Sequence, residues 1–203
     1  MDDLYAVVAP LVRPRETYAL MYGEEDPEEL NLMQVQDRQA AEQIDSVMYD
    51  LYGLETHLAD PRDEEGLEEP IGTVADLHEL RRIAAELHGK TEDDYQEGRV
   101  QAGAQFNHLI NHADDSGYYL PVDFLQAFAI EEVSVGSAAV LLKELEALEP
   151  VLTERFAAEV ARANATPDDE ERADISGPVG VWHSLQRLCR SALALNLPIH
   201  IDG

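Results

Sequence analysis

The sequence is poor in cations, in cysteine and in long apolar runs. Its 203 residues include 14 Lys and Arg against 42 Asp and Glu, which gives a formal net charge of −28. A chain this acidic repels nucleic-acid phosphates and anionic membrane surfaces, and the sequence shows no continuous basic stretch that would overcome the repulsion. We therefore expect neither nucleic acid nor a membrane as its binding partner.

The single cysteine, Cys189, cannot form an internal disulfide, so nothing in the chain calls for an oxidising compartment. The chain starts Met1-Asp2-Asp3, which is acidic where a signal peptide is basic. Its apolar runs are all shorter than the roughly 18 residues that a membrane-spanning helix needs. These features predict a cytoplasmic protein.

The common catalytic signatures are missing as well. The sequence contains no G-x-x-x-x-G-K-[ST] loop, no G-x-G-x-x-G fingerprint, no G-x-S-x-G elbow, and neither C-x-x-C nor H-E-x-x-H. Each absence argues against one class of enzyme. We therefore expect a binding protein rather than an enzyme.

Hydrophobic residues make up 45% of the chain, which suits a folded domain. Their spacing is mostly that of α-helices, and short apolar segments at 118–124, 127–133 and 197–201 read as extended. This pattern predicts a mainly α fold, a bundle of about six helices with two or three short extended segments able to pair. The predicted helices span 28–52, 74–87, 91–113, 138–148, 151–163 and 178–195.

About two hundred residues suit a single domain, 1–203. The acidic residues gather in clusters beside Pro, Gly, Ser or Thr, as is typical of loops and of the first turns of helices. The segment 59–72 is rich in acids and holds two prolines and two glycines. We predict an acidic loop or linker there.

Two histidines form the first candidate site. His108 and His112 are four residues apart, so on the predicted helix 91–113 they share one face, which points away from the apolar stripe. Two imidazoles at this spacing can bind a divalent metal ion, with a third ligand from elsewhere in the chain. The alternative is a pair of surface or interface histidines without metal. No other cofactor is predicted.

The residues that follow form the second candidate site, for a protein partner. Asp114 and Asp115 oppose the dipole at the predicted helix end, which indicates a cation nearby, either an arginine or a metal ion. Tyr118 and Tyr119 lie in an extended segment and would point to opposite faces. Tyrosine is frequent at recognition surfaces, so we assign these four residues to partner binding.

Acidity without catalytic motifs favours an interaction role. We predict a non-catalytic inhibitor or immunity-like protein that binds a basic protein partner with the help of electrostatic steering. The alternative is a metal-dependent enzyme on a helical bundle, with His108 and His112 as ligands. A third possibility is that the charge reflects only adaptation to a salt-rich cytoplasm. The sequence predicts no oligomeric state.

Overall fold

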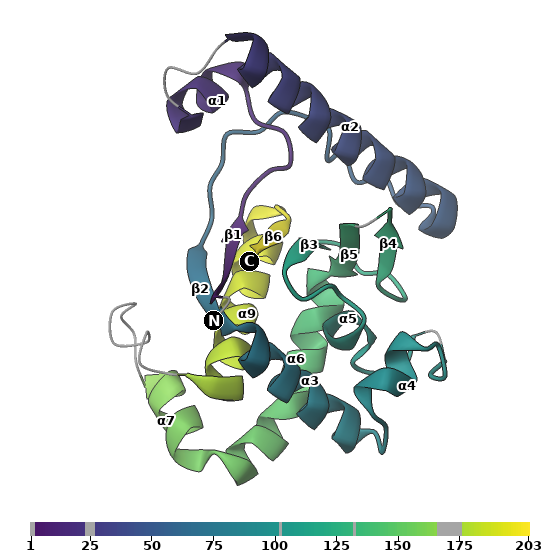
Figure 1. The fold of residues 1–203 in the computed structure, drawn as a ribbon, viewed down its shortest axis with the longest axis vertical. Coiled ribbons are helices and arrows are strands. Elements are labelled where there is room, and N and C mark those ends of the chain that lie inside the picture. Colours follow the sequence, from purple (N-terminus) through teal and green to yellow (C-terminus); the bar gives the residue numbers. More distant parts are fainter. Residues whose placement is uncertain (1–2, 23–26, 102, 132, 166–175) are drawn as a thin grey trace. The chain divides into compact units, whose positions relative to one another are not determined.

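The computed structural model of the protein describes residues 3–22, 27–101, 103–131, 133–165 and 176–203 (Figure 1). The chain forms two compact units. Unit 1 contains residues 1–8 and 66–203, and unit 2 contains residues 9–65. Unit 2 is therefore an insertion in the chain of unit 1.

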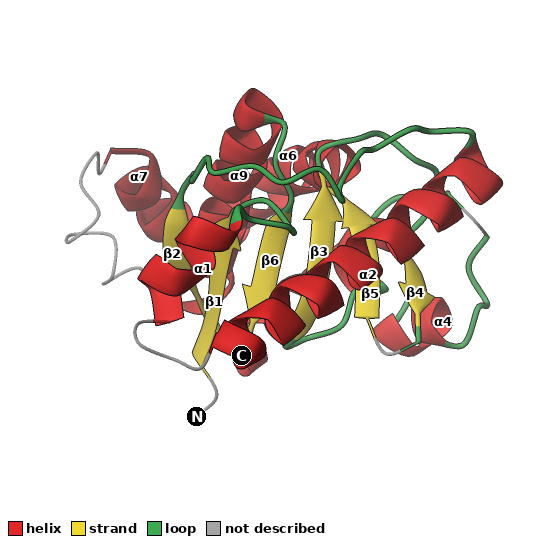
Figure 2. Cartoon of the chain, turned by 90° about the horizontal axis from the view of Figure 1, so that it is seen from above, coloured by secondary structure: helices red, strands yellow, loops and turns green. Residues whose placement is uncertain are grey.

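Unit 1 is built on a six-stranded mixed sheet with the strand order β2-β1-β6-β3-β5-β4 (Figure 2). Neighbouring strands run antiparallel except β3 and β5, which are parallel. The C-terminal strand β6 lies between β1 and β3, so both ends of unit 1 meet in the middle of the sheet. The strands are β1 (Asp3–Val8), β2 (Glu68–Thr73), β3 (Ser116–Leu120), β4 (Phe128–Ile130), β5 (Val133–Ser137) and β6 (Ile199–Asp202).

The helices α3, α6 and α9 of unit 1 pack together and against the sheet, and their apolar faces form its core. Trp182 on α9 is buried there and donates a hydrogen bond from Nε1 to the Leu145 carbonyl oxygen at 2.8 Å. Cys189 on the same helix is buried in this core too. The helices are α3 (Val74–Leu87), α4 (Glu92–Gln96), α5 (Asn107–Ile110), α6 (Ala138–Arg155), α7 (Ala157–Ala165) and α9 (Gly177–Leu195).

Two helices of unit 1 begin with the same acidic capping box. At the start of α3, the Thr73 hydroxyl accepts from the Asp76 backbone N–H at 3.2 Å, and the Asp76 carboxylate accepts from the Thr73 N–H at 3.3 Å. Thr91 and Asp94 repeat this arrangement at α4. The clusters of acids at helix starts therefore have a local structural role.

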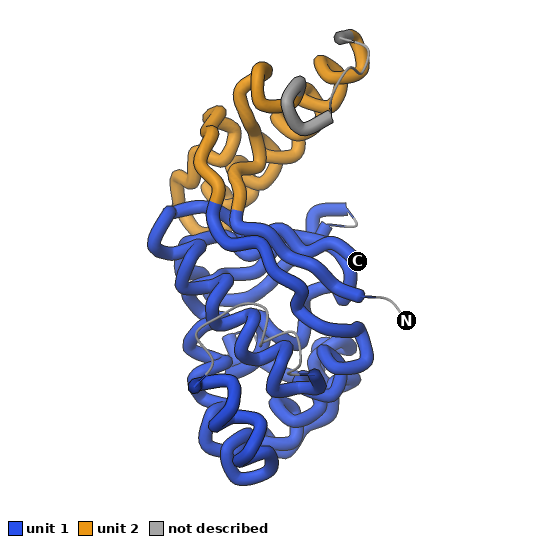
Figure 3. The backbone as a smooth tube through the Cα atoms, turned by 90° about the vertical axis from the view of Figure 1, so that its left-hand side faces the viewer, with its two compact units in different colours: residues 1–8, 66–203 blue, residues 9–65 orange. Residues whose placement is uncertain are grey.

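Unit 2 consists of α1 (Arg15–Tyr22), α2 (Pro27–Tyr52) and an extended return segment (Figure 3). Asp45 on α2 holds the return segment, because its carboxylate accepts from the N–H groups of Leu58 at 3.0 Å and Ala59 at 3.2 Å. The predicted helix 28–52 is confirmed. The acidic segment 59–72 forms the last part of unit 2 and most of β2.

The prediction of a mainly α helical bundle is wrong, because unit 1 is a mixed α/β fold with a six-stranded sheet. The extended segments 118–124, 127–133 and 197–201 correspond to β3, β4 with the start of β5, and β6. The two strands that were not predicted are β1 and β2. Only six residues alternate in β1, and β2 contains Pro70 and Gly72, residue types that are rare within strands.

The predicted helix 91–113 is also wrong. It is replaced by α4 and α5, with an irregular segment between them. Gly98 and Gly103 in that segment have φ values of +69° and +73°, in the left-handed region that an α-helix excludes. Pro150 was expected to separate two helices, but α6 continues through it to Arg155.

Candidate partner-binding surface

His108 is completely buried, and both its ring nitrogens have partners inside the protein. Its Nδ1 accepts from the Ser137 backbone N–H at 2.9 Å, so Nε2 carries the proton and donates to the Phe124 carbonyl oxygen at 3.1 Å. Burial lowers the pKa of His108 to about 4. The ring is therefore neutral at physiological pH and serves as a connection between α5, β5 and the loop after β3.

His112 is buried too. Its Nδ1 lies 3.1 Å from the Ala113 carbonyl oxygen and its Nε2 lies 3.2 Å from that of Tyr118. The ring stacks on Tyr119 with 4.0 Å between centroids. Burial lowers the pKa of His112 to about 4, although both carbonyl contacts favour the charged form. This histidine thus joins the end of α5 to β3.

The predicted orientation of the two histidines is wrong, because both rings lie in the interior. The reason is that α5 ends at Ile110, so His108 and His112 do not lie one turn apart on a helix. Within the described residues, no three His, Cys, Asp or Glu side chains are arranged to hold a metal ion. A metal site at this pair would require the ring hydrogen bonds to break, and it stays a prediction.

Arg81 on α3 supplies the cation at the end of α5. Its guanidinium is 1% exposed and donates from Nε to the Leu109 carbonyl oxygen at 2.9 Å. Its Nη2 donates to the carbonyl oxygens of His112 at 2.9 Å and Ala113 at 3.2 Å, and its Nη1 pairs with Asp114. The expectation that a cation offsets the acids at this helix end is confirmed, and that cation is an arginine.

A second link fixes the same carboxylate. His78 Nδ1 lies 3.1 Å from Glu92 Oε2, and His78 Nε2 lies 3.1 Å from Asp114 Oδ2. The imidazole joins α3, α4 and the loop before β3. The next residue, Asp115, is exposed and has no ion-pair partner in the described part of the chain.

Glu144 on α6 closes the other end of α5. Its side chain is buried, with Oε1 accepting from the His108 N–H at 3.1 Å and Oε2 from the Leu109 N–H at 2.8 Å. Burial raises the pKa of Glu144 to about 8, although the backbone N–H groups favour the charged form. A buried acid thus replaces a side-chain cap at the first residues of α5.

The two tyrosines of β3 point to opposite faces of the sheet, as the extended segment predicted. Tyr119 is 3% exposed, and its hydroxyl donates to the His108 carbonyl oxygen at 3.2 Å. Tyr118 is half-buried and meets His200 on β6 edge-on, with 4.9 Å between ring centroids. Only Tyr118 therefore has surface that a partner could reach.

Most cations of unit 1 are paired with acids of the same unit. Arg99 pairs with Asp94 at 2.7 Å and also contacts Glu97, and Lys143 pairs with Asp123 at 2.6 Å. Such exposed pairs contribute little to stability, but they remove positive charge from the surface. The remaining pairs join Arg81 to Asp114, Arg82 to Glu79 and Glu86, Arg155 to Glu86, and Arg187 to Glu69.

Many carboxylates are left over after this pairing. Unit 1 carries 27 Asp and Glu against 10 Lys and Arg, and unit 2 carries 15 against 4, so each unit is acidic by itself. One set of side chains is called the acidic surface below. It consists of the exposed carboxylates of unit 1 that have no ion pair in the described chain. Its members are Asp3, Glu68, Asp93, Asp115, Glu131, Glu146, Glu149, Glu154, Glu159 and Asp202.

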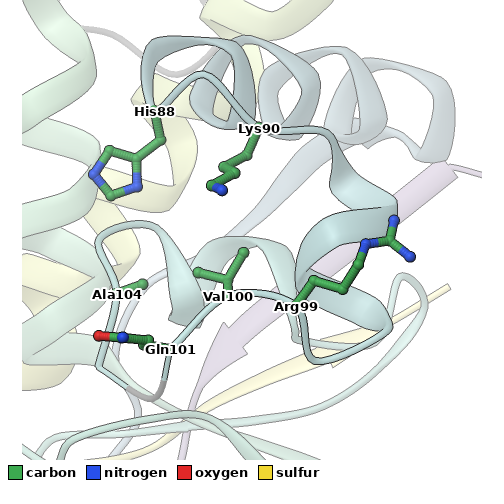
Figure 4. A pocket seen from close by; sticks show the side chains of 6 residues that line it. All are labelled: His88, Lys90, Arg99, Val100, Gln101 and Ala104. Atoms are coloured by element: carbon green, nitrogen blue, oxygen red, sulfur yellow. The ribbon is translucent and has the colours of Figure 1, made fainter.

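A hollow of about 380 Å³ is lined by residues that lie between α3 and α5 in the chain (Figure 4). Unlike the acidic surface, it has no acidic side chain among its lining residues. The Lys90 side chain extends toward Val100, whereas the Arg99 guanidinium turns away from both. The other lining residues are His88, Gln101 and Ala104. Asp94 and Glu97 offset the charge of Arg99, so the net charge of the hollow is the positive charge of Lys90.

Sequence reasoning missed Arg81, His78 and Glu144. For two of them the sequence did offer a signal, which is a charged residue on the apolar side of a helix. Arg81 lies beside Leu80 on the apolar side of α3, and Glu144 lies beside Leu145 on the apolar side of α6. A charged residue at a core position is rarely buried without a partner. His78 carried no such signal, since its partners come from α4 and from the loop before β3.

Comparison with known proteins gives one match. Residues 70–201 match the family described as "Putative DNA-mimic protein". The match includes all helices of unit 1 and five of its strands, from within β2 into β6, and it leaves out β1 and unit 2. No curated protein and no solved structure matches the chain.

This match corrects two predictions. The predicted function was an inhibitor or immunity-like protein that binds a basic protein partner, with a metal-dependent enzyme as the alternative. This prediction is wrong, because the matching family is described as one of DNA mimics. The predicted set of partners, a basic protein and no nucleic acid, is corrected for the same reason, because mimicry of DNA ties the partner to DNA binding, while a protein partner agrees with the match. Among the described helices, none is both long and apolar enough to cross a membrane. Because the match covers well over half of the sequence, the chain belongs to the "Putative DNA-mimic protein" family.

Proposed function

We propose that the protein binds DNA-binding proteins at the surface with which they hold DNA, and that its carboxylates take the place of DNA phosphates. The observation that carries this proposal is the acidic surface, a set of exposed carboxylates left over after ion pairing on the fold of a DNA-mimic family. Lys and Arg of a DNA-binding site bind phosphate oxygens, and carboxylates offer Arg the same paired acceptors.

The spacing of charges along α6 supports the proposal. Glu146, Glu149 and Glu154 are exposed on this helix, three and five residues apart. At 1.5 Å per residue, these intervals correspond to a rise of about 4.5 Å and about 7.5 Å. A DNA strand carries one charge per about 3.4 Å of its axis, so the intervals on α6 are about one to two times the phosphate spacing.

The carboxylates around α4 support it through their rigidity. Arg81 and His78 fix Asp114, and His78 also fixes Glu92 at the start of α4. Carboxylates that are already ordered lose less conformational entropy when a partner binds. We therefore keep Asp114 as a proposed partner contact. Asp115, a member of the acidic surface, stays a proposed contact beside it, with Tyr118 rather than the buried Tyr119. We place the interaction in the cytoplasm, as the single cysteine also predicts.

Displacement from DNA tests the proposal. A host lysate is loaded on double-stranded DNA cellulose at low salt, and the column is eluted with the purified protein. We expect it to release DNA-binding proteins that polyglutamate of equal total charge leaves on the column. Release of nothing, or only of what polyglutamate releases, would show that the acidity has no DNA-like arrangement.

A further inference from the structure

Unit 2 lies outside the part of the chain that matches the family. It leaves unit 1 after β1 and returns before β2, and the two connections are tied together. The Val8 N–H donates to the Leu67 carbonyl oxygen at 2.9 Å, and the Gly66 N–H donates to that of Val8 at 2.8 Å. Unit 2 is therefore an addition to the matched region, and a role specific to this chain can reside in it.

The long helix α2 has two different faces. Its buried face carries Leu30, Ala41, Ile44 and Met48. The opposite face carries three large apolar side chains in contact with solvent, which are Leu32 at 55% exposure, Val35 at 43% and Tyr49 at 60%. At 100° per residue, these three positions fall within an arc of about 100°.

The three side chains form two groups on this side of the helix. Leu32 and Val35 are one turn apart and share a patch, and Tyr49 lies about 21 Å further along the axis from Val35. Helices that bind in a groove of a partner present apolar anchors on one face, of which the i, i+3 pair of Leu32 and Val35 is one element, and Tyr is a frequent anchor. The face is suited to a groove rather than to a flat polar surface.

The charges on the same face restrict what can cover it. Glu42 and Asp50 are exposed there without an ion pair in the described chain, and Glu28 lies on the same side of the helix. Arg38 is exposed at the edge of the face, so the acids outnumber the cations and the face is negative on balance. A second copy of this face would bring acids against acids, and an anionic lipid surface would be repelled too. An apolar groove bordered by Lys or Arg complements both the anchors and the acids.

We propose that this face of α2 docks into a cation-bordered apolar groove on the same DNA-binding protein that the acidic surface engages, and that it selects among DNA-binding proteins. The inference rests on the proposed function, which supplies the partner. Carboxylates in place of phosphates suit any DNA-binding surface. Contacts of Leu32 and Val35 have no equivalent on a phosphate backbone, so they distinguish one partner from another.

The test uses proteins released from DNA cellulose by the wild-type chain, each purified. Their affinities are measured for the wild type, for the triple variant Leu32→Ser, Val35→Ser, Tyr49→Ser, and for a control variant of α2. The control is Gln36→Ser with Gln43→Ser, two exposed polar positions outside the arc of the three apolar side chains. The single variant Leu32→Ser is measured in case the apolar triple variant loses helicity.

We expect the apolar triple variant to bind the preferred protein about tenfold more weakly at both low and high salt, because apolar contacts are not screened. The control should stay within about twofold of the wild type. Equal affinities of wild type and apolar triple variant for every released protein would overturn the inference alone. If the wild type releases no protein from DNA, the proposed function fails, and the inference fails with it.

Discussion

The buried guanidinium of Arg81 on α3 donates to the carbonyl oxygen of Leu109 on α5 at 2.9 Å. The same group holds Asp114, so one buried cation satisfies the end of α5 and fixes a carboxylate at the surface. The orientation of the acids in this loop therefore depends on a side chain in the core of unit 1.

Replacing Arg81 with Met should destabilise unit 1 by about 3–5 kcal/mol, because Asp114 loses its buried partner and three backbone carbonyl oxygens lose a donor. Urea denaturation followed by circular dichroism measures this. Arg82→Met is the control, since Arg82 pairs only with exposed acids and should cost less than about 1 kcal/mol. Similar losses for the two variants would show that Arg81 has no special role.

Glu144 should make the protein less stable as the pH rises from 4.5 to about 8. Its pKa is about 8 in the folded chain against 4.5 as the ordinary value, so the folded state holds the extra proton between these limits. Stability from this group therefore falls as pH rises from 4.5 toward 8. The free energy of unfolding against pH measures this fall, and Glu144→Gln should remove it. If the free energy of unfolding of the variant still falls over this pH range, the fall belongs to another group.

His108 and His112 should act in the opposite direction. Their pKa values are about 4 in the folded chain against 6.5 as the ordinary value, so below 6.5 the unfolded state binds more protons. Stability from these groups is complete above pH 6.5 and is lost as pH falls toward 4. Ring chemical shifts in an NMR titration should show both midpoints near 4, and midpoints near 6.5 would contradict the buried, neutral rings.

Gly117 should tolerate no side chain. Its φ is +122°, and a Cβ atom there would lie 2.4 Å from the Ser134 carbonyl oxygen on β5. Gly117→Ala should therefore cost more than the about 1–3 kcal/mol of backbone strain alone, as measured by thermal unfolding. Gly89→Ala is the matched control, because Gly89 also has a positive φ but has open space around it. Equal losses of stability in the two variants would show that the close contact with Ser134 adds nothing to the backbone strain.

Local signals in the sequence were sufficient for some elements and insufficient for others. The apolar spacing over 74–87 predicted α3 correctly, because the signals of a helix, such as this spacing and the capping box of Thr73 and Asp76, lie within a few residues of one another. Strand β2 is held by pairing with β1, more than 60 residues away in the chain, and such pairing leaves no local pattern. Because β1 and β2 were not recognised, the sequence predicted only two or three short extended segments beside a helical bundle.

The candidate site shows the same division. The need for a cation near Asp114 followed from local helix electrostatics, while its source, Arg81, depends on how α3 packs against α5. The buried state of the two histidines depends on the end of α5 at Ile110, and no local pattern in the sequence marks that end. Function had no local signal at all, since acidity fits many roles.

The central claim, that the acidic surface replaces DNA, is tested most directly by competition. A released DNA-binding protein is bound to a fluorescein-labelled duplex, and the anisotropy is followed as this protein is added. The wild type should displace the duplex, and less effectively as salt rises. The comparison is a variant with six neutralised acids, namely Asp93→Asn, Asp115→Asn, Glu146→Gln, Glu149→Gln, Glu154→Gln and Glu159→Gln.

Our account predicts that this six-site variant needs at least about tenfold more protein than the wild type to release half of the duplex, a loss of about 1.4 kcal/mol or more in binding. The variant should keep its circular dichroism spectrum, since none of the six carboxylates has an ion pair in the described structure. Equal displacement by the two proteins, or binding of either to the partner while the duplex stays bound, would contradict the claim.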